Sequence, residues 1–190
     1  MGHCLLIVSV VAAAALQRGA ELLMARRRLR LSAQETGALA DREPGFAAIV
    51  AVHAAWLAGC ALEPLLWPRP VPPALLWGAA AVWAAALLLR VWTLRTLGRL
   101  WHVRVIRRAR QPIVTGGPYR FIRHPNYVVV FAEIAAVPLL LGAFATALLG
   151  SVANAVVLAG RIRREEAYLL ALPAYRAAFA DKPRFLPRLF

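Results

Sequence analysis

The chain has 190 residues, of which 61% are apolar; its mean hydropathy is +0.61 and its formal net charge is +14. So apolar a composition excludes an ordinary soluble domain and predicts a single integral membrane domain. The charge does not indicate nucleic-acid binding, because the basic residues lie between apolar segments, where membrane proteins place them.

The first apolar segment runs from about residue 3 to residue 24. No basic residue precedes its apolar core, and RRRLR at 26–30 follows it. This order of charge predicts a retained helix that begins outside the cell, rather than a cleaved signal peptide. A second segment follows at about 46–66 and a third at about 74–94. The prolines of the turn at 67–73 exclude one continuous helix across both.

The last apolar run, 127–160, is too long for one membrane helix. At about 1.5 Å per residue a single helix would extend about 50 Å, whereas the hydrocarbon core of a bilayer is about 30 Å thick. Pro138 and Gly142 lie near the middle of the run. The run therefore predicts a helical hairpin that turns near Leu141–Phe144.

Most basic residues lie in three stretches, 26–42, 90–123 and 161–188. Five crossings place all three on one side, which the positive-inside rule assigns to the cytoplasm. We therefore expect an all-α integral membrane protein with about five transmembrane segments, an external N-terminus and a cytoplasmic C-terminal helix. Within this single domain, 1–94 holds three helices and 95–190 holds the hairpin and the tail. Anionic membrane lipids suit the basic cytoplasmic face.

The densest polar cluster, GGPYRFIRHPNY at 116–127, lies at the cytoplasmic start of the hairpin. Proline is favoured at the first position of a helix, so Pro125 predicts a helix with His124 at its N-cap and Tyr127 in its first turn. The free N–H groups and the dipole at that end attract an anionic group. Three further polar residues lie just before it: Tyr119, Arg120 and Arg123. The cluster favours a binding loop, although Tyr and Arg are also ordinary anchors at a membrane boundary.

Two polar residues lie inside the hairpin. Glu133 is nearly two turns beyond Tyr127, and Asn154 is in the second arm. An ionisable residue in a membrane segment is costly and should face the protein interior or a wet cavity. Glu133 and Asn154 either hydrogen-bond each other and lock the hairpin, or Glu133 forms a wall of a polar pocket open to the cytoplasm.

The tail carries adjacent carboxylates, Glu165 and Glu166, which point about 100° apart on a helix. Only one can readily face a given pocket, and the other can pair with a basic residue. A packing stripe follows at helical spacing: Leu169, Leu172, Tyr175 and Phe179. On composition alone this tail is equally an amphipathic helix that caps the bundle.

The earlier helices hold four more polar residues of interest. Arg18 and Glu21 are three apart on one helix face and can pair. His53 and Glu63 are ten apart in the second segment. Any of Glu21, His53 and Glu63 is a candidate to line an acceptor site, although His53 also suits a satisfied core histidine.

Several function classes are excluded by missing motifs. The chain has no P-loop and no strand-linked G-x-G-x-x-G, so we expect no soluble nucleotide fold. No HExxH or comparable ligand set indicates a metal, and no G-x-S-x-G indicates acyl transfer. The cysteines, Cys4 and Cys60, lie in apolar runs without metal spacing.

The sequence GPYRFIRHPNY, an intramembrane Glu, and then RIRREEAYL with YRAAF and PRFLP resemble the isoprenylcysteine carboxyl methyltransferase (ICMT) family over roughly 97–187. The resemblance implies an integral membrane enzyme that uses S-adenosylmethionine and encloses it between the RHPxY and EE segments. Carried over residue by residue, it implies a set of cofactor-binding residues: Tyr119, His124, Pro125, Tyr127, Glu165 and Glu166. Arg184 resembles the tail arginine near the reacting methyl group. Phe179 stands where many members have Tyr.

The N-terminal half, RGAELLMARRRLRLSAQETGA followed by VAVHAAWLAGCALE, resembles a bacterial subfamily that methylates alkylpyrones and related lipids of type III polyketide synthases. This implies an oxygen acceptor on an amphiphilic lipid that enters from the bilayer, and a polyketide pathway as partner. With Arg184, the candidate catalytic residues are Glu133 and His53, because a Glu or His can take the acceptor's proton while an Arg holds its anion. Glu165 or Glu166 is expected to accept hydrogen bonds from ribose hydroxyls or the adenine amine.

Two other hypotheses about the function stay open. A membrane reductase of the sterol-reductase type would use NADPH, whose 2′-phosphate a basic cluster would bind: Arg104, Arg107, Arg108 and Arg110. The third class is a small non-catalytic membrane protein.

Overall fold

The computed structural model describes residues 2–36, 39–40, 45–101, 106–107 and 112–187. Its main helices, in chain order, are α1 (Gly2–Thr36), α2 (Phe46–Leu66), α3 (Pro73–Leu97), α4 (Pro125–Leu140), α5 (Phe144–Leu170) and α6 (Pro173–Phe179). Short 3₁₀ helices, η1 (Gly98–Leu100) and η2 (Gly117–Arg120), follow α3 and precede α4. Two-residue strands, β1 (Leu39–Ala40) and β2 (Ile106–Arg107), pair antiparallel, with Leu39 opposite Arg107 and Ala40 opposite Ile106.

The described helices suit a membrane. Four of them are long and apolar enough to cross it, and α4 is a shorter apolar helix. Large apolar side chains, such as Leu16, Leu88 and Val156, are exposed on the outer surfaces of α1, α3 and α5. Surface of this kind is favourable against hydrocarbon and unusual against water. The predicted all-α integral membrane fold is confirmed.

The predicted hairpin is also confirmed. α4 ends at Leu140 and α5 begins at Phe144. Gly142, between them, has a left-handed backbone with φ of 74°, and a Cβ on it would come within 2.9 Å of the Arg69 carbonyl oxygen. The turn therefore needs glycine both for its conformation and for its close contact with the α2–α3 loop. At 16 residues α4 extends about 24 Å, less than a bilayer core.

Glu63 connects α2 to this turn. Its carboxylate accepts hydrogen bonds from the backbone N–H groups of Ala145 and Thr146, at 3.0 and 2.7 Å, and Arg69 lies 3.5 Å away. Those N–H groups begin α5 and have no partner within the helix, so Glu63 supplies the missing acceptor. The structure therefore does not support the candidate role of Glu63 in an acceptor site. Its carboxylate caps a helix instead of lining the cavity described below.

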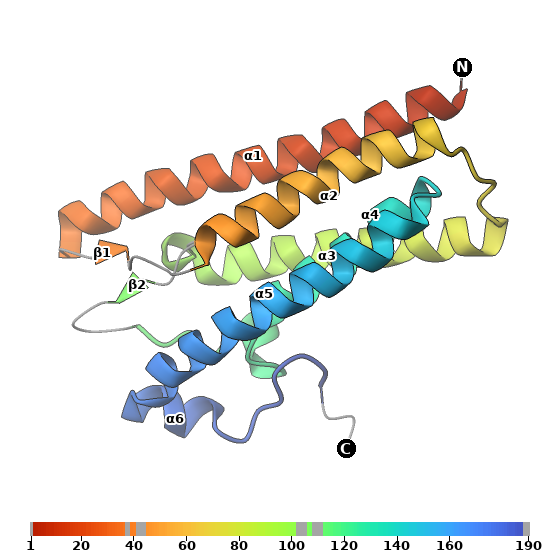
Figure 1. Cartoon of the computed structure of the whole chain (residues 1–190). Coiled ribbons are helices and arrows are strands. Elements are labelled where there is room, and N and C mark those ends of the chain that lie inside the picture. The colour runs from red at the N-terminus through yellow and green to blue at the C-terminus, as the bar shows by residue number, and fades with distance from the viewer. Residues whose placement is uncertain (1, 37–38, 41–44, 102–105, 108–111, 188–190) are drawn as a thin grey trace.

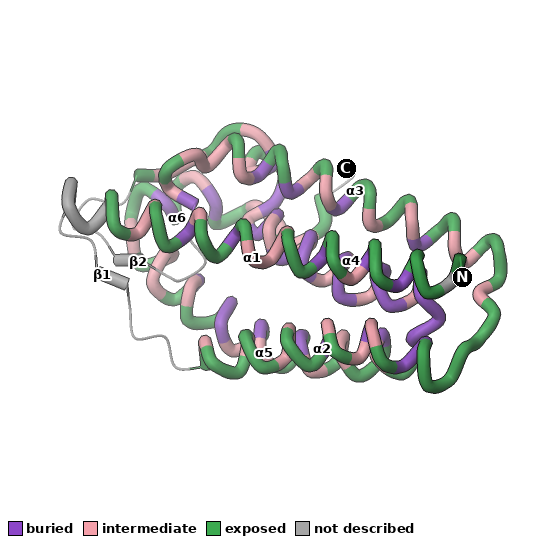
Figure 2. Tube along the Cα trace, turned by 90° about the horizontal axis from the view of Figure 1, so that it is seen from above, coloured by how far each residue is buried: buried purple, intermediate pink, exposed green. Residues whose placement is uncertain are grey.

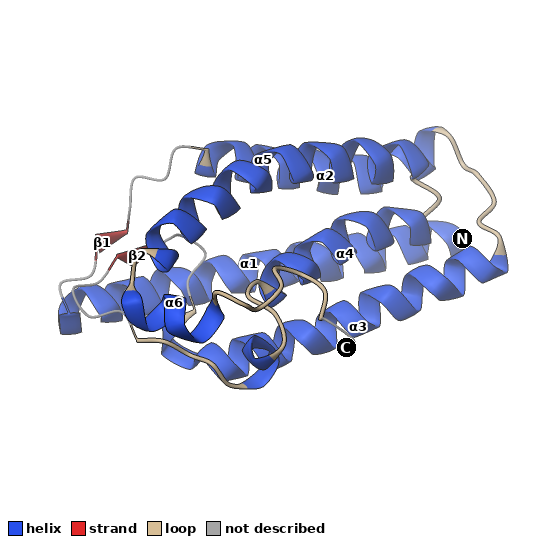
Figure 3. Cartoon of the chain, turned by 90° about the horizontal axis from the view of Figure 1, so that it is seen from below, coloured by secondary structure: helices blue, strands red, loops and turns tan. Residues whose placement is uncertain are grey.

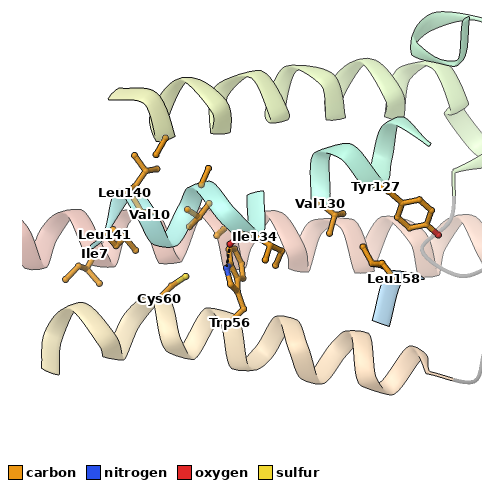
Figure 4. Close-up of a cluster of buried hydrophobic side chains, with 14 of the residues drawn as sticks. Ile7, Val10, Trp56, Cys60, Tyr127, Val130, Ile134, Leu140, Leu141 and Leu158 are labelled. Atoms are coloured by element: carbon orange, nitrogen blue, oxygen red, sulfur yellow. Dashed lines mark hydrogen bonds between the residues drawn. The ribbon is translucent and has the colours of Figure 1, made fainter. Parts of the chain in front are cut away.

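Helix α4 is the buried centre of the bundle, as Figure 2 shows by its colouring. It packs against α3 on one side and α5 on the other. Figure 4 shows the core, in which apolar side chains of α1, α2 and α4 meet around Trp56. The indole N–H of Trp56 donates a 3.0 Å hydrogen bond to the backbone oxygen of Ile134. Pro138, four residues later, has no N–H to offer that oxygen, so the side chain replaces the missing helical bond.

The two ends of the bundle differ in character. Figure 1 places the N-terminus, the α2–α3 loop and the α4–α5 turn at one end, and β1, β2 and α6 at the other. Figure 3 shows the same arrangement from below, with β1, β2 and α6 again at the end away from the N-terminus. The end that holds β1, β2 and α6 therefore contains the segments that the charge pattern of the sequence predicts to share one side of the membrane.

Candidate active site

The site begins with the local structure at the start of α4. His124 is the N-cap residue and Pro125 the first helical residue, as predicted. The C-terminal tail lies alongside this loop, because the backbone N–H groups of Arg123 and His124 donate to the carbonyl oxygens of Pro183 and Arg184 at 2.9 and 3.0 Å. The side chain of Lys182 donates to the Tyr119 carbonyl oxygen at 2.8 Å. Segments about sixty residues apart are thus joined into one wall.

A glycine in the loop before α4 allows η2 to pack closely against α3. Gly117 has a φ of 55°, and a Cβ on it would lie 2.2 Å from the Thr96 hydroxyl oxygen of α3. Gly116 has an ordinary φ of −82° and open space around it. Only the second glycine of the pair is therefore required for η2 to dock on α3.

The two motif segments meet through two hydrogen bonds. The Tyr127 hydroxyl donates to Glu165 Oε2 at 2.5 Å, and His124 Nε2 lies 3.0 Å from Glu166 Oε1. A carboxylate only accepts, so Nε2 of His124 carries a proton. Glu165 and Glu166 do diverge as expected: Glu165 lines a cavity, and Glu166 is buried among basic groups.

Glu166 holds three segments together. Its carboxylate is bound by Arg184 of the tail, with Nη2 at 2.6 Å and Nε at 2.9 Å, and by Arg123 at 3.2 Å, besides His124. The carboxylate raises the pKa of the Arg184 guanidinium through hydrogen bonding and its negative charge. This network is expected to order the tail against the start of α4.

A cavity of about 440 Å³ lies between these segments and the N-terminal helices. Its volume is in the range of small-molecule sites. One part is polar and holds side chains of the motif segments: Tyr119, Arg123, His124, Asn126, Tyr127 and Glu165. Burial, and to a lesser extent Glu165, raises the pKa of Tyr119 and of Tyr175, so both phenols keep their protons and can donate hydrogen bonds.

The other part of the cavity is apolar and lies between α2, α4 and α5. It is lined by aliphatic side chains, including Ile49, Val50, Leu57, Val130 and Leu158. His53 lies among them, with Nδ1 2.8 Å from the Ile49 carbonyl oxygen. A carbonyl oxygen only accepts, so Nδ1 carries the proton and the neutral ring offers Nε2 as an acceptor.

A buried ion cluster forms one end of the cavity. As predicted, Arg18 and Glu21 of α1 form an ion pair at 3.2 Å. Arg18 also contacts Glu133, and Glu21 also contacts Arg90. Glu133 is bound by Gln17, Arg18 and Arg90. The interpretation in which Glu133 and Asn154 lock the hairpin is therefore wrong, because arginines of α1 and α3 occupy the carboxylate.

Two predicted catalytic residues lie outside the cavity wall. Glu133 belongs to the ion cluster but does not line the cavity, and Arg184 is turned to Glu166 with about half of its side chain, 54%, exposed. Of the three residues predicted to be catalytic, His53 alone lines the cavity. Pro125 does not line it either, and positions His124 through the start of α4.

In the sequence, Arg90 is one of the many basic residues that the positive-inside rule assigns to the cytoplasmic side. The structure buries its side chain to 4% exposure between Glu21 and Glu133. The signal was present, because Arg90 ends the apolar run AAALLL and an arginine there needs a carboxylate partner. Of the basic cluster considered for NADPH, Arg104, Arg108 and Arg110 lie outside the described residues, as does the side chain of Arg107.

Two comparisons with known proteins bear on this site. The model of the isoprenylcysteine carboxyl methyltransferase (ICMT) family matches residues 79–171, a range that runs from α3 to the end of α5. The chain is also 34% identical over 158 residues to the uncharacterized protein YpbQ of Bacillus subtilis (strain 168), covering 83% of this chain and 92% of that protein. The family match includes the start of α4 and both carboxylates of the EE pair.

Proposed function

The chain belongs to the isoprenylcysteine carboxyl methyltransferase family, and is thus a membrane methyltransferase of a family that uses S-adenosylmethionine; from this premise we propose that it methylates an oxygen atom of a lipophilic acceptor such as an alkylpyrone. The observation that carries the proposal is the pair of bonds from Tyr127 to Glu165 and from His124 to Glu166. They bring the two family motifs to one cavity that is polar at one part and apolar at another.

The residues of the polar part fit the cofactor. Among the described residues of this wall, Oδ1 of Asn126, an acceptor, and Nε of Arg123, a donor, are buried without a hydrogen-bond partner. S-Adenosylmethionine has an amine and hydroxyls to donate and a carboxylate to accept. Glu165 is the residue we assign to the ribose hydroxyls or the adenine amine, since a carboxylate only accepts. Tyr119 supplies a phenol that stays protonated.

The chemistry requires a nucleophilic oxygen aligned with an activated methyl group, with little water present. When bound, S-adenosylmethionine supplies that methyl group on its positive sulfonium. The aliphatic side chains around His53 form an apolar wall that disfavours water and suits the apolar tail of the acceptor. His53 Nε2 is the acceptor for the proton of the attacking hydroxyl, because Nδ1 is committed to Ile49. Glu133 and Arg184 act as positioning residues in this scheme.

We also propose the orientation in the membrane that the charge distribution favours, with the N-terminus outside and the cavity open to the cytoplasm. Cys4 is exposed near the N-terminus and Cys60 is fully buried in the core. A membrane-impermeant maleimide should therefore label Cys4 in intact cells and leave Cys60 unlabelled. Labelling of Cys4 only after the inner face is opened would reverse the orientation.

The test of the function uses the full chain in nanodiscs. Calorimetry should detect S-adenosylmethionine and no NADPH, and labelled cofactor should transfer methyl to a long-chain 6-alkyl-4-hydroxy-2-pyrone or a 5-alkylresorcinol. Transfer only to a prenylcysteine would retain the family activity and remove the acceptor. NADPH binding without S-adenosylmethionine would favour a reductase. His124→Ala and Glu166→Ala should abolish cofactor binding, which a non-catalytic protein would not need.

A further inference from the structure

Four charged side chains from three helices meet inside the membrane-spanning part of the bundle. Arg18 Nη2 lies 2.7 Å from Glu133, and Arg90 Nη1 lies 2.5 Å from Glu21. Arg18 also pairs with Glu21 and Arg90 with Glu133. The two arginines and two glutamates balance, so the cluster has no net charge. Glu133 lies about 9 Å along α4 beyond Tyr127, which places the cluster deeper than the polar part of the cavity.

A structural role alone is a weak explanation for this cluster. Burying charges in hydrocarbon is costly, and apolar residues of similar size often stabilise a fold as well as a buried ion pair does. Arg18, Glu21 and Arg90 also line the cavity, so the cluster is in contact with whatever occupies it. Ionisable side chains at membrane depth that face a cavity are typical of ligand sites.

The two arginines are not equivalent. Arg90 is 4% exposed, and each of its three nitrogens contacts Glu21 or Glu133. Arg18 is 16% exposed and contacts the same two carboxylates through one N–H of each terminal nitrogen. A guanidinium has five N–H donors, so Arg18 has donors beyond these two bonds in the described part of the chain. Arg90 therefore holds the carboxylates, and they hold Arg18 at the cavity.

We infer that Arg18, fixed by Glu21, Arg90 and Glu133, binds the acidic oxygen of the acceptor as an anion, so that the acceptors are enols, phenols or carboxylates on apolar tails rather than neutral alcohols. This inference rests on the proposed function and names the acceptor class of the same cavity. A guanidinium is suited to it, since charge-assisted bonds to oxygen anions are strong and directional.

The transfer then balances in charge and atoms. The acidic hydroxyl gives its proton to His53 or to water before the transfer. The oxygen anion forms the new bond to carbon, the carbon–sulfur bond breaks, and its electron pair stays on sulfur. One negative and one positive charge disappear together, which a cavity of low dielectric favours. A neutral alcohol keeps its proton in the same cavity and lacks the charge that Arg18 recognises.

The experiment compares Arg18→Gln with Arg26→Gln in the full chain in nanodiscs. Arg26 is on the same helix and exposed, so its substitution controls for loss of charge on α1. The acceptors are the long-chain hydroxypyrone, the alkylresorcinol, N-acetyl-S-farnesylcysteine and a neutral alcohol with the same tail. For Arg18→Gln we expect the KM for the acidic acceptors to rise at least about 10-fold, the loss of a charge-assisted hydrogen bond. The Kd for S-adenosylmethionine should stay within about twofold by the same scale.

A second measurement needs no variant. The hydroxypyrone and its methyl ether share tail and ring, and compete for the wild-type chain in the presence of S-adenosylhomocysteine. The acid should bind at least about 10-fold more tightly. Equal affinity, an unchanged KM in folded Arg18→Gln, or efficient methylation of the neutral alcohol would each overturn the inference. A wild-type chain that neither binds S-adenosylmethionine nor methylates any acceptor would instead overturn the proposed function.

Discussion

The hydroxyl of Tyr127 lies 2.5 Å from Glu165 Oε2, so the first turn of α4 is fixed to the C-terminal half of α5. The two residues are 38 positions apart in the chain and come from opposite arms of the hairpin. Because α4 and α5 are antiparallel neighbours, a residue near the start of one arm meets a residue near the end of the other. The hairpin thus creates the contact between the motifs, and the hydrogen bond sets the direction of the carboxylate.

Tyr127→Phe and Glu165→Gln should weaken cofactor binding to different degrees. The first removes only the donor that positions Glu165, and we expect the Kd for S-adenosylmethionine to rise about threefold to tenfold. The second removes the anionic acceptor itself and should raise the Kd about tenfold or more. Calorimetry on nanodisc samples measures both. Asp181→Asn, which changes an exposed carboxylate of the tail, is the matched control and should bind normally. Equal binding by all three variants would remove Glu165 from the cofactor site.

Two roles of Arg184 can be distinguished by experiment: a catalytic role at the reacting methyl group and a positioning role through Glu166. Its bonds to Glu166 predict positioning, so Arg184→Gln should raise the Kd for the cofactor and make the tail around residues 180–187 more sensitive to protease. Arg184→Lys should restore part of the binding, since it keeps the charge but loses the planar fork. Arg176→Gln, another tail arginine whose partner is the Leu170 carbonyl oxygen, is the control. If kcat falls while the Kd and the protease pattern stay unchanged, Arg184 acts at the reacting methyl group after all.

Gly116 and Gly117 form a matched pair for testing how the loop reaches the cavity. Gly117→Ala has to adopt a φ near 55° and to place a Cβ against Thr96, so we expect a loss of stability of about 1–3 kcal/mol and weaker cofactor binding. Gly116→Ala meets neither obstacle and should behave as the wild type. Thermal unfolding in detergent with and without S-adenosylmethionine measures both effects. Similar behaviour of the two alanine variants would contradict the docking of η2 on α3.

The sequence was most informative where a single local rule applies. The length of 127–160 and the positions of Pro138 and Gly142 predicted the hairpin, and the His124–Pro125 pair predicted the start of α4; both are confirmed. These features depend on backbone geometry, which proline and glycine constrain wherever they occur.

The partners of polar residues were harder to predict. In the sequence, Glu63 and Glu133 are both ionisable residues inside predicted membrane segments. In the structure, Glu63 caps α5 and Glu133 belongs to the ion cluster. Their roles depend on which helices become neighbours, and periodicity within one helix does not contain that information. The pair of Arg18 and Glu21 was predictable because i and i+3 lie on one face. Arg90 and Glu133, 43 positions apart, required the packing of α3 on α4.

The hydrogen bond from Trp56 to Ile134 provides a direct way to test how α2 packs on α4. Pro138 leaves the Ile134 carbonyl oxygen without its helical donor, and Trp56 supplies one from α2. Trp56→Phe should therefore cost about 1–3 kcal/mol for an unsatisfied buried carbonyl, in addition to the lost packing area. In a Pro138→Ala background the new N–H of residue 138 satisfies that oxygen within α4, and the cost of Trp56→Phe should fall by about 1 kcal/mol or more.

Unfolding of the two single variants, the double variant and the wild type in mixed detergent gives this coupling energy directly. Packing losses are common to both backgrounds and cancel in the cycle. Trp77→Phe, at an exposed tryptophan of α3, controls for the loss of an indole at the membrane surface and should show no coupling to Pro138. Additive costs for Trp56 and Pro138 would mean that the indole contributes packing alone. A coupling of the expected sign would establish that α2 completes the hydrogen bonding of the helix that carries the site.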